Sequence, residues 1–245
     1  MKTLKLSYSK LTDFLSCPKK FELKHLLGKE EEFKETIYTS FGSAIHSAIE
    51  DSLNKDYDFD AAFCIFKREL SKHIMGVEIK ERQTIFLPTW ENKGKIVLQY
   101  FFDEYFDELK DKVVETEHYF SYPIVIGDVE ISFNGFVDLI YKIDDKIKLI
   151  DWKTGKKQSK KDNLQLRIYA LILYKLYNYD ISEIKYAFIK DETENVLEID
   201  QKVIEETEKE LLMIITNILE TKEFKKCFSN NCRFCNMKKY CVEEE

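Results

Sequence analysis

One stretch of the chain constrains its fold more than any other: residues 134–153, with the sequence NGFVDLIYKIDDKIKLIDWK. Two apolar-rich runs, residues 129–143 and 147–152, flank the pair Asp144-Asp145. Short β-rich runs separated by turn-forming residues are typical of a β-hairpin, and the aspartate pair fits its two-residue turn. The stretch therefore predicts two adjacent antiparallel strands with a fixed register.

Three charged side chains share one face of this predicted hairpin. With Asp144-Asp145 as the turn, Asp138 lies directly opposite Asp151, and the side-chain period of two places Lys153 on the same face. Directly opposed like charges destabilise a sheet unless something compensates them. A divalent cation would do so, and carboxylate oxygens suit the hard cations Mg²⁺ and Mn²⁺. The alternative is a solvated hairpin face with a simple Asp–Lys pair.

The neighbours of the two acids favour the metal site over the solvated face. Each acid interrupts an apolar run, Asp138 in the sequence VDL and Asp151 in the sequence IDW. A carboxylate in a buried strand is costly unless it is paired, hydrogen-bonded or bound to a metal. These positions therefore indicate a functional site.

The spacing of Asp138 from Asp151-Trp152-Lys153 resembles the core of the PD-(D/E)xK nucleases, and the flanking segments resemble the RecB-type branch of that superfamily. Four other motifs carry the resemblance across nearly the whole chain. They are Leu6-Ser7-Tyr8-Ser9 with Cys17-Pro18, a GxxxH motif at residues 42–46, a QxxxY motif at residues 165–169, and the cysteines at 232, 235 and 241. Each motif alone is weak, but their order and separation are specific. The chain is similar to the stand-alone nucleases of CRISPR adaptation and to the nuclease domains of recombination helicases.

The resemblance implies an α/β fold with a restriction-endonuclease-like core, in which a central mixed β-sheet is flanked by helices. The apolar periodicity predicts mainly helices in residues 1–112, the catalytic sheet in residues 113–200, and a helix with the cysteine tail in residues 201–245. The sequence shows no internal repeat, low-complexity tract or Pro/Ser-rich linker, so we expect one domain over residues 1–245.

The resemblance also implies metal-assisted hydrolysis of a phosphodiester bond. His46, Asp138, Asp151 and the backbone carbonyl of Trp152 would hold Mg²⁺ or Mn²⁺, which lowers the pKa of a bound water and neutralises charge on the phosphate. Lys153 would orient that water and stabilise the developing oxyanion. The sequence contains no GxxxxGK[ST] or GxGxxG segment, so it predicts no ATP-driven motor.

His46 lies near the core-facing edge of a predicted amphipathic helix over residues 41–53. A lone histidine in such a position is more often a hydrogen-bonded structural residue than a ligand. The resemblance reverses that order, because the equivalent histidine of the family reaches the metal. Glu50, one turn further on, and Glu117, in the first predicted strand, are further candidates, and a solvated surface position is the alternative for both.

Gln165 and Tyr169 share one face of a helix predicted over residues 163–179. Asp162 followed by Gln165 also resembles a capping box, in which the glutamine satisfies the helix N-terminus, while Tyr169 fits ordinary core packing. The resemblance implies instead that both residues support the active site and its DNA contacts. Arg167 would be a further DNA-binding residue.

The run Cys232-x2-Cys235-x5-Cys241 predicts a metal or cluster site, because we expect a cytoplasmic protein in a reducing compartment. That expectation comes from the lack of a secretory signal and of any apolar run long enough to span a bilayer. The fourth ligand is either Cys227, in a compact zinc knuckle, or Cys17. The resemblance favours Cys17 and a structural [4Fe–4S] cluster, with Zn²⁺ as the alternative.

The net charge of −7 argues against a surface that coats DNA broadly. Residues 146–161 are an exception, with seven lysines against one acid and thus a local charge of +6. Such a run is usually a solvated loop, but this one begins in the predicted active-site hairpin and so favours a track for the phosphate backbone. The lysines expected to contact DNA are Lys156, Lys157, Lys160 and Lys161.

We therefore expect a metal-dependent DNA nuclease, an exonuclease or end-trimming enzyme for single strands or duplex ends. Its expected setting is recombination, repair or CRISPR-adaptation-like processing with a helicase or integrase-type partner and no membrane. The alternative is a non-catalytic nucleic-acid-binding or scaffolding module, which predicts loss of a metal ligand or of Lys153, and all of these residues are present. A zinc-stabilised interaction protein is a third hypothesis, which predicts bound zinc and no cleavage.

Overall fold

The computed structural model describes residues 3–31, 36–77, 82–155, 163–229, 232–233 and 235–242. The chain forms two compact units. Unit 1 comprises Met1–Lys34, Phe120–Gly135 and Glu208–Glu245, and unit 2 comprises Glu35–Tyr119 and Phe136–Thr207. The expectation of one domain over residues 1–245 stays a prediction, and each unit is described below by itself.

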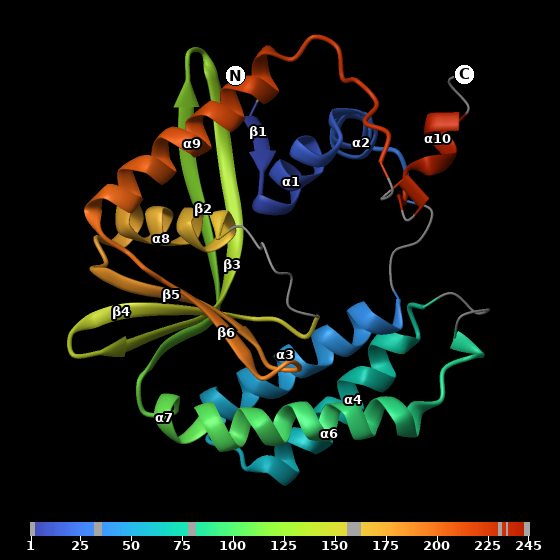
Figure 1. Ribbon diagram of the computed structural model, residues 1–245, viewed down its shortest axis with the longest axis vertical. Coiled ribbons are helices and arrows are strands. Elements are labelled where there is room, and N and C mark those ends of the chain that lie inside the picture. The colour runs from blue at the N-terminus through green and yellow to red at the C-terminus, as the bar shows by residue number, and fades with distance from the viewer. Residues whose placement is uncertain are drawn as a thin grey trace. The chain divides into compact units, whose positions relative to one another are not determined.

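Unit 2 contains a mixed β-sheet, visible in Figure 1. The end of β3 (Val129–Ile143) pairs antiparallel with β4 (Lys146–Trp152), which pairs parallel with β5 (Ile181–Phe188). β5 in turn pairs antiparallel with β6 (Thr193–Glu198), and β2 (Val113–Ile126) pairs with β3. The predicted mixed sheet is confirmed.

The hairpin between β3 and β4 has the predicted turn. Asp144 and Asp145 have φ angles of 48° and 62°, the left-handed values that a two-residue type I′ turn requires at both positions. The ladder pairs Ile143 with Lys146 and continues to Leu139 opposite Ile150. This register is the one that brings Asp138 and Asp151, the next residues along, to the same end of the hairpin.

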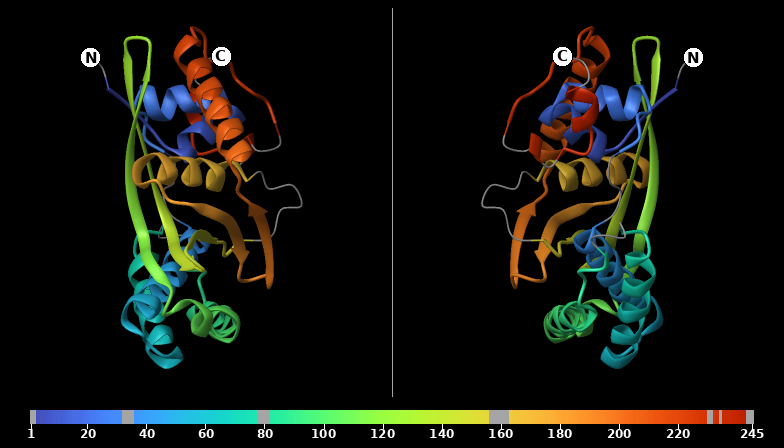
Figure 2. Two further views of the ribbon diagram at one scale, coloured as in Figure 1. Left: turned by 90° about the vertical axis from the view of Figure 1, so that its left-hand side faces the viewer. Right: turned by 90° about the vertical axis from the view of Figure 1, so that its right-hand side faces the viewer.

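Three helices cover one face of this sheet, and a fourth covers the other (Figure 2). α3 (Ile37–Lys55), α4 (Phe59–Ile74) and α6 (Leu87–Phe101) pack on one another and on the side chains of Leu139, Tyr141, Ile150, Trp152 and Ala187. α8 (Leu164–Tyr177) contacts β4 and β5. Because strand side chains alternate, the residues between those core positions, including Asp138 and Asp151, face the α8 side.

Two of the helices of unit 2, α3 and α4, begin at side-chain caps. Thr36 and Thr39 form a reciprocal capping box at the start of α3, and Asp58 accepts a hydrogen bond from the Ala61 N–H at the start of α4. α6 continues into η2 (Phe102–Phe106) and α7 (Asp107–Leu109), which complete the helices before β2.

Unit 1 contains a strand that the sequence analysis did not predict. β1 (Thr3–Leu6) pairs parallel with the start of β3, with Leu6 opposite Phe133. The other elements of this unit are α1 (Tyr8–Ser16), α2 (Pro18–Phe21), η1 (Glu22–Leu26), α10 (Lys238–Val242) and the second part of α9 (Gln201–Glu220). Phe14, Phe21 and Phe224 form an aromatic cluster with ring centroids 5.6–6.3 Å apart.

Candidate active site

The carboxylates of Asp138 and Asp151 lie at the end of the β3–β4 hairpin in unit 2. The Trp152 backbone N–H donates to Asp138 Oδ2 at 2.8 Å. The Asp151 side chain is buried, and its carboxylate forms an ion pair with the ammonium of Lys153. The Lys153 N–H donates to the Ala187 carbonyl at 2.8 Å, which ties the end of β4 to β5. The hairpin thus holds two acids and a lysine together, as its sequence predicted.

His46 reaches this group from α3. Its Nε2 lies 3.0 Å from the carbonyl oxygen of Trp152, and because a carbonyl only accepts, Nε2 carries the proton. Nδ1 then faces the acids, 3.5 Å from Asp138 Oδ2 and 3.7 Å from Glu117 Oε1. A hydrogen bond to a backbone carbonyl that fixes the tautomer is what orients a metal-ligating histidine in many sites.

A glycine one turn before His46 lets α3 approach the end of β4. A Cβ atom at Gly42 would lie 3.0 Å from Thr154 Oγ1, closer than nearly all such contacts. Gly42 and His46 are four residues apart and therefore lie on the same face of the helix. The GxxxH spacing thus has a physical reason in this fold, since the glycine allows the approach and the histidine uses it.

The acids in this site outnumber the cations that balance them. Burial raises the pKa of Asp138 to about 7, and the nearby charge of Asp151 adds to this effect. Burial lowers the pKa of His46, but the hydrogen bond with Glu117 and the charges of Asp138 and Asp151 outweigh it and raise the pKa to about 9. The local field therefore favours an added positive charge.

The donor set fits a divalent cation. His46, Glu117 and Asp138 each offer one ligand atom, and these atoms all lie within 4.8 Å of one another. In an octahedral Mg²⁺ site with bonds of about 2.1 Å, ligands lie about 3.0–4.2 Å apart, so small movements would complete coordination. Among the described residues, no other group of three histidine, cysteine or acidic side chains is this close.

Glu117 is the residue of this group that the sequence analysis left between two alternatives. It lies in β2 with a φ angle of 47°, which is uncommon for a residue other than glycine. Such a left-handed conformation within a strand costs on the order of 1–3 kcal/mol and is concentrated at functional sites. Glu50, the other acidic candidate, is not one of the three residues of this group. Burial and the charge of Glu117 raise the pKa of Glu50.

The other two predicted ligands have partners of their own. Asp151 is paired with Lys153, and the Trp152 carbonyl accepts from His46. Asp151 lies beside the ligand group without being one of its three members. The roles of Asp151 and Trp152 as metal ligands stay predictions.

Gln165 connects Lys153 to α8 and β5. Gln165 Nε2 donates to the Tyr169 hydroxyl at 3.0 Å, while Oε1 lies 3.5 Å from both Lys153 Nζ and the Tyr186 hydroxyl. Lys153 Nζ also lies 5.2 Å from the centre of the Tyr186 ring. The glutamine side chain is therefore directed toward the acids and lysine.

The capping-box alternative for Gln165 required Asp162, which lies outside the described residues. The residue directly before α8 is Asn163.

A sequence model of the PD-(D/E)XK nuclease superfamily matches residues 5–242. The chain belongs to this superfamily. The hairpin register and an ion pair bring Asp138, Asp151 and Lys153 together, and their assignment to the pattern that names the superfamily stays a prediction.

Two solved structures are similar to this chain, and the first of them shares its fold. A crystal structure named "Putative exonuclease", from Eubacterium rectale, is 15% identical with a TM-score of 0.56, over 94% of this chain and 87% of that one. The crystal structure of SSO0001 is 14% identical with a TM-score of 0.41, over 98% of this chain and 87% of that one. No curated protein sequence matches the chain.

Of the residues predicted to contact DNA, only Arg167 lies in the described part of the chain. Arg167 Nη1 lies 3.4 Å from the hydroxyl of Thr207, a fully buried residue of α9, so the guanidinium has a contact within unit 2. Its DNA-binding role stays a prediction. The four lysines predicted for the phosphate backbone lie outside the described residues: Lys156, Lys157, Lys160 and Lys161.

The cysteines of unit 1 do not form the predicted ligand cluster. In the part of the chain that the structure describes, no three cysteine sulfurs lie within 4.8 Å of one another, and no two cysteines form a disulfide. The Cys232 thiol instead donates to the Cys227 carbonyl at 3.5 Å and accepts from the Ser229 N–H at 3.4 Å. The structure therefore does not support a [4Fe–4S] cluster or Zn²⁺ on the predicted ligands, Cys17, Cys232, Cys235 and Cys241.

None of the described helices has an apolar stretch long enough to cross a membrane.

Proposed function

We propose that this chain is a divalent-metal-dependent deoxyribonuclease that removes nucleotides from single-stranded DNA or from duplex ends. Membership of the nuclease superfamily supports phosphodiester hydrolysis. The observation that carries the proposal is the convergence of His46, Glu117 and Asp138 beside the Asp151–Lys153 pair. A role in recombination, repair or CRISPR-adaptation-like processing, with a helicase or integrase-type partner, belongs to the same proposal.

Three side chains would hold Mg²⁺ or Mn²⁺: His46 through Nδ1, and Glu117 and Asp138 through carboxylate oxygens. With the cation bound, the site supplies the positive charge that activates a water and stabilises negative charge on the phosphate. The Nε2–H of His46 donates to the Trp152 carbonyl, which keeps Nδ1 directed at the acids. Asp151 lies beside this group and holds the ammonium of Lys153.

Lys153 would stabilise the charge that develops on the phosphate oxygens. Its ammonium is held by Asp151, Gln165 and the ring of Tyr186, so its direction is fixed before substrate arrives. Preorganised donors of this kind are typically worth about 10²–10³ in rate. Gln165 and Tyr169 would act as positioning residues, because they contact Lys153 or its neighbours and not the ligand group.

The test compares two aspartates of the same hairpin. Full-length wild type, Asp151→Asn and Asp145→Asn are incubated with end-labelled single-stranded DNA, duplex DNA and RNA, in Mn²⁺, Mg²⁺ or EDTA. Asp145 is the matched control, since its carboxylate is in the turn and 95% exposed. We expect metal-dependent degradation of DNA by wild type and Asp145→Asn only. DNA binding without cleavage by wild type, or cleavage of RNA alone, would contradict the proposal.

A metal centre on the cysteines is a separate hypothesis from the nuclease site. Iron and zinc analysis of anaerobically purified wild type and Cys235→Ser would test it. Four thiolates on one cluster predict loss of the bound metal in the variant.

A further inference from the structure

A pocket with an aromatic wall lies next to the proposed catalytic site, within unit 2. It has a volume of about 500 Å³ and is formed by α3, α6, the residues after β4 and the residues after β5. Small-molecule and base-sized ligands typically occupy pockets of about 300–1,000 Å³. Its walls include Tyr38, Phe41 and Trp90. None of these residues belongs to the ligand group.

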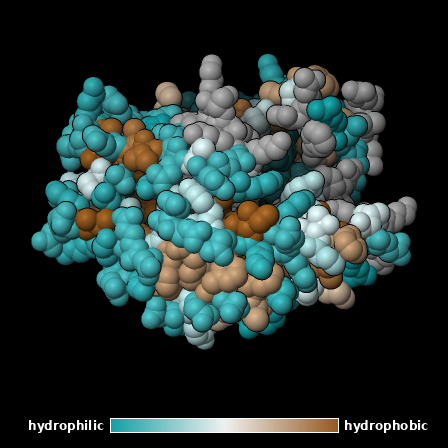
Figure 3. Space-filling view, turned by 60° about the horizontal axis from the view of Figure 1, so that its bottom comes forward, coloured by the Kyte–Doolittle hydropathy of each residue, from teal (hydrophilic) through white to brown (hydrophobic). Residues whose placement is uncertain are grey.

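The aromatic side chains form one packed group with an open edge. The Tyr38 and Trp90 rings meet edge to face with centroids 5.3 Å apart, and the Phe41 and Trp90 centroids are 5.5 Å apart. Phe41 is buried, whereas Tyr38 is 71% exposed. Phe41 therefore belongs to the core, and Tyr38 presents a ring to whatever enters the pocket. Figure 3 shows that hydrophobic side chains on one face of the molecule gather in separate patches on a mainly hydrophilic surface.

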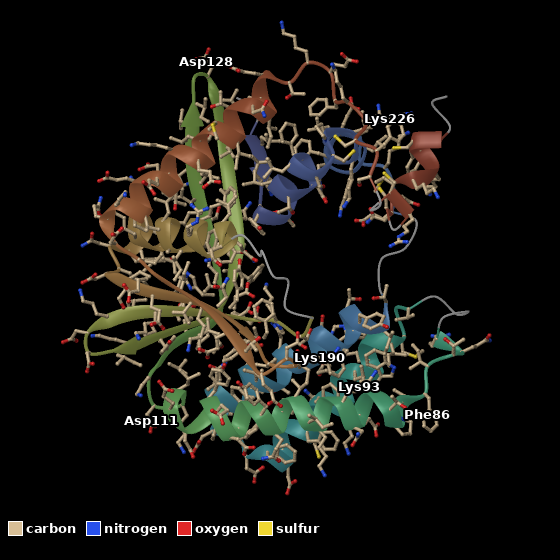
Figure 4. The ribbon with its side chains drawn as sticks, viewed as in Figure 1. Phe86, Lys93, Asp111, Asp128, Lys190 and Lys226 are labelled. Atoms are coloured by element: carbon tan, nitrogen blue, oxygen red, sulfur yellow. The ribbon has the colours of Figure 1, made fainter. Side chains whose placement is uncertain are left out.

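Two lysines give the pocket a positive charge. Lys93 from α6 and Lys190 from the residues after β5 both line it, and Figure 4 labels them. Lys93 Nζ lies 4.1 Å from the centre of the Trp90 ring, a cation–π contact. Neither lysine forms an ion pair with any residue that the structure describes, and no acidic residue lines the pocket. The pocket therefore suits a ligand with a flat apolar face and a negative charge.

The position of the pocket relates it to the scissile bond. Thr154 and Gly155, which line it, directly follow Lys153. Tyr38 and His46 both lie in α3, eight residues and thus about 12 Å apart along the helix axis. A strand whose phosphate lies at the metal ligands would have a neighbouring nucleotide within reach of the pocket.

We propose that this pocket stacks an unpaired base of the DNA strand next to the cleaved phosphate, with Lys93 and Lys190 facing the adjoining backbone. The inference rests on the proposed nuclease function and specifies its substrate as single-stranded or frayed DNA. A base within a duplex has both faces covered by its neighbours, so only an unstacked base exposes a face to Tyr38. Aromatic stacking of this kind tolerates any base, which suits an enzyme that degrades ends without sequence preference.

The experiment measures binding, so it does not depend on cleavage. A short labelled single-stranded oligonucleotide, and the same oligonucleotide with one abasic site at each position in turn, are titrated with full-length protein in EDTA. The proteins are wild type, Tyr38→Ala and Phe86→Ala. Phe86 is a matched control, since it is 68% exposed near the start of α6 and does not line the pocket.

We expect an abasic site at one position to weaken binding by wild type and Phe86→Ala about 5- to 150-fold, the range for one stacked base. In Tyr38→Ala the same abasic site should weaken binding less, with a change in free energy below about half of the wild-type change. Part of the stacking is already lost in this variant, so the abasic site has less to remove. A second signal comes from Trp90, since DNA in the pocket should quench its fluorescence and Trp90→Phe should remove that change.

Three results would overturn the inference. One is a flat abasic scan in wild type, and another is an abasic penalty that Tyr38→Ala leaves unchanged. The third is a Tyr38-dependent dimer without DNA, which would assign the pocket to a second copy of the chain. Failure of the proposed function looks different: wild type would not cleave any DNA in Mn²⁺ or Mg²⁺, whatever the binding scan shows.

Discussion

Two buried aspartates in different units of the molecule have opposite electrostatic surroundings. The side chains of Asp13 in unit 1 and Asp138 in unit 2 are each 13% exposed. Burial raises the pKa of Asp13, but contacts with His25, Lys20 and Lys24 outweigh it and lower the pKa to about 2. The pKa of Asp138 rises to about 7, because burial and the charge of Asp151 exceed the effect of His46.

The difference lies in the cations that the protein itself supplies. Asp13 Oδ1 is 2.7 Å from Lys20 Nζ, and Oδ2 is 2.8 Å from His25 Nε2. Asp138 has one histidine at 3.5 Å and lies in a group that also contains Glu117. A buried acid with its own cations is structural, whereas a buried acid among other acids indicates that a cation comes from outside. The predictions below test this distinction.

The largest effect should come from Asp138→Asn. Loss of a metal ligand should reduce metal-dependent DNA cleavage by more than about 100-fold. Mutation of a residue that only hydrogen-bonds to a metal ligand already lowers metal affinity or activity by about 10- to 100-fold. Steady-state cleavage rates in saturating Mn²⁺ measure this. Asp13→Asn is the control and should keep the wild-type rate. Equal losses in the two variants would show that the two aspartates do not differ in the proposed way.

Added metal should stabilise the protein only through the Asp138 group. At a hundred times the dissociation constant, Mn²⁺ should raise the free energy of unfolding by about 2.7 kcal/mol. Thermal unfolding with and without Mn²⁺ should show this increase for wild type and Asp13→Asn, and a much smaller one for Asp138→Asn. An increase of the same size in all three proteins would place the ion elsewhere.

Asp13→Asn should instead lower stability at neutral pH. The pKa falls from 3.8 to about 2 on folding, and a shift of this size corresponds to about 2 kcal/mol. A folded-state pKa below the unfolded value gives stability that is present above pH 3.8 and is lost as the pH falls through about 2. Urea unfolding of wild type and Asp13→Asn across this range should therefore converge at low pH. A constant difference would contradict the ion-pair explanation.

The smallest effect should come from Glu117→Gln. An amide oxygen keeps one ligand atom but removes its charge, so metal affinity should fall about 10-fold, the lower range for altered metal sites. The Mn²⁺ concentration that gives half-maximal cleavage should therefore rise, and the full cleavage rate should return in excess metal. A rate that stays low at saturation would assign Glu117 another role.

The hairpin was predictable from the sequence because its register depends on local chemistry. Two residues able to adopt positive φ form the turn, and the period of two then places Asp138 and Asp151. The mixed sheet flanked by helices followed from the motif order. β1 was not predicted, since its four residues form a strand only by pairing with β3, more than a hundred residues later.

The sequence named His46 and Glu117 as candidates, but the geometry that brings them to the site depends on distant contacts and could not be predicted. Glu117 joins the group through an unusual backbone angle in β2, which no residue pattern indicates. The orientation of His46 depends on the Trp152 carbonyl, 106 residues away. The cysteine spacing suggested a cluster, but the Cys232 thiol has backbone partners instead.

The most direct test of the account is the stoichiometry of Mn²⁺ binding, measured by isothermal titration calorimetry on metal-free wild type, Asp138→Asn and Asp13→Asn. The account predicts a specific site in wild type and Asp13→Asn that is lost in Asp138→Asn. Binding that is unchanged in Asp138→Asn, or absent from folded wild type, would contradict the claim that the buried acids of unit 2 form a metal site.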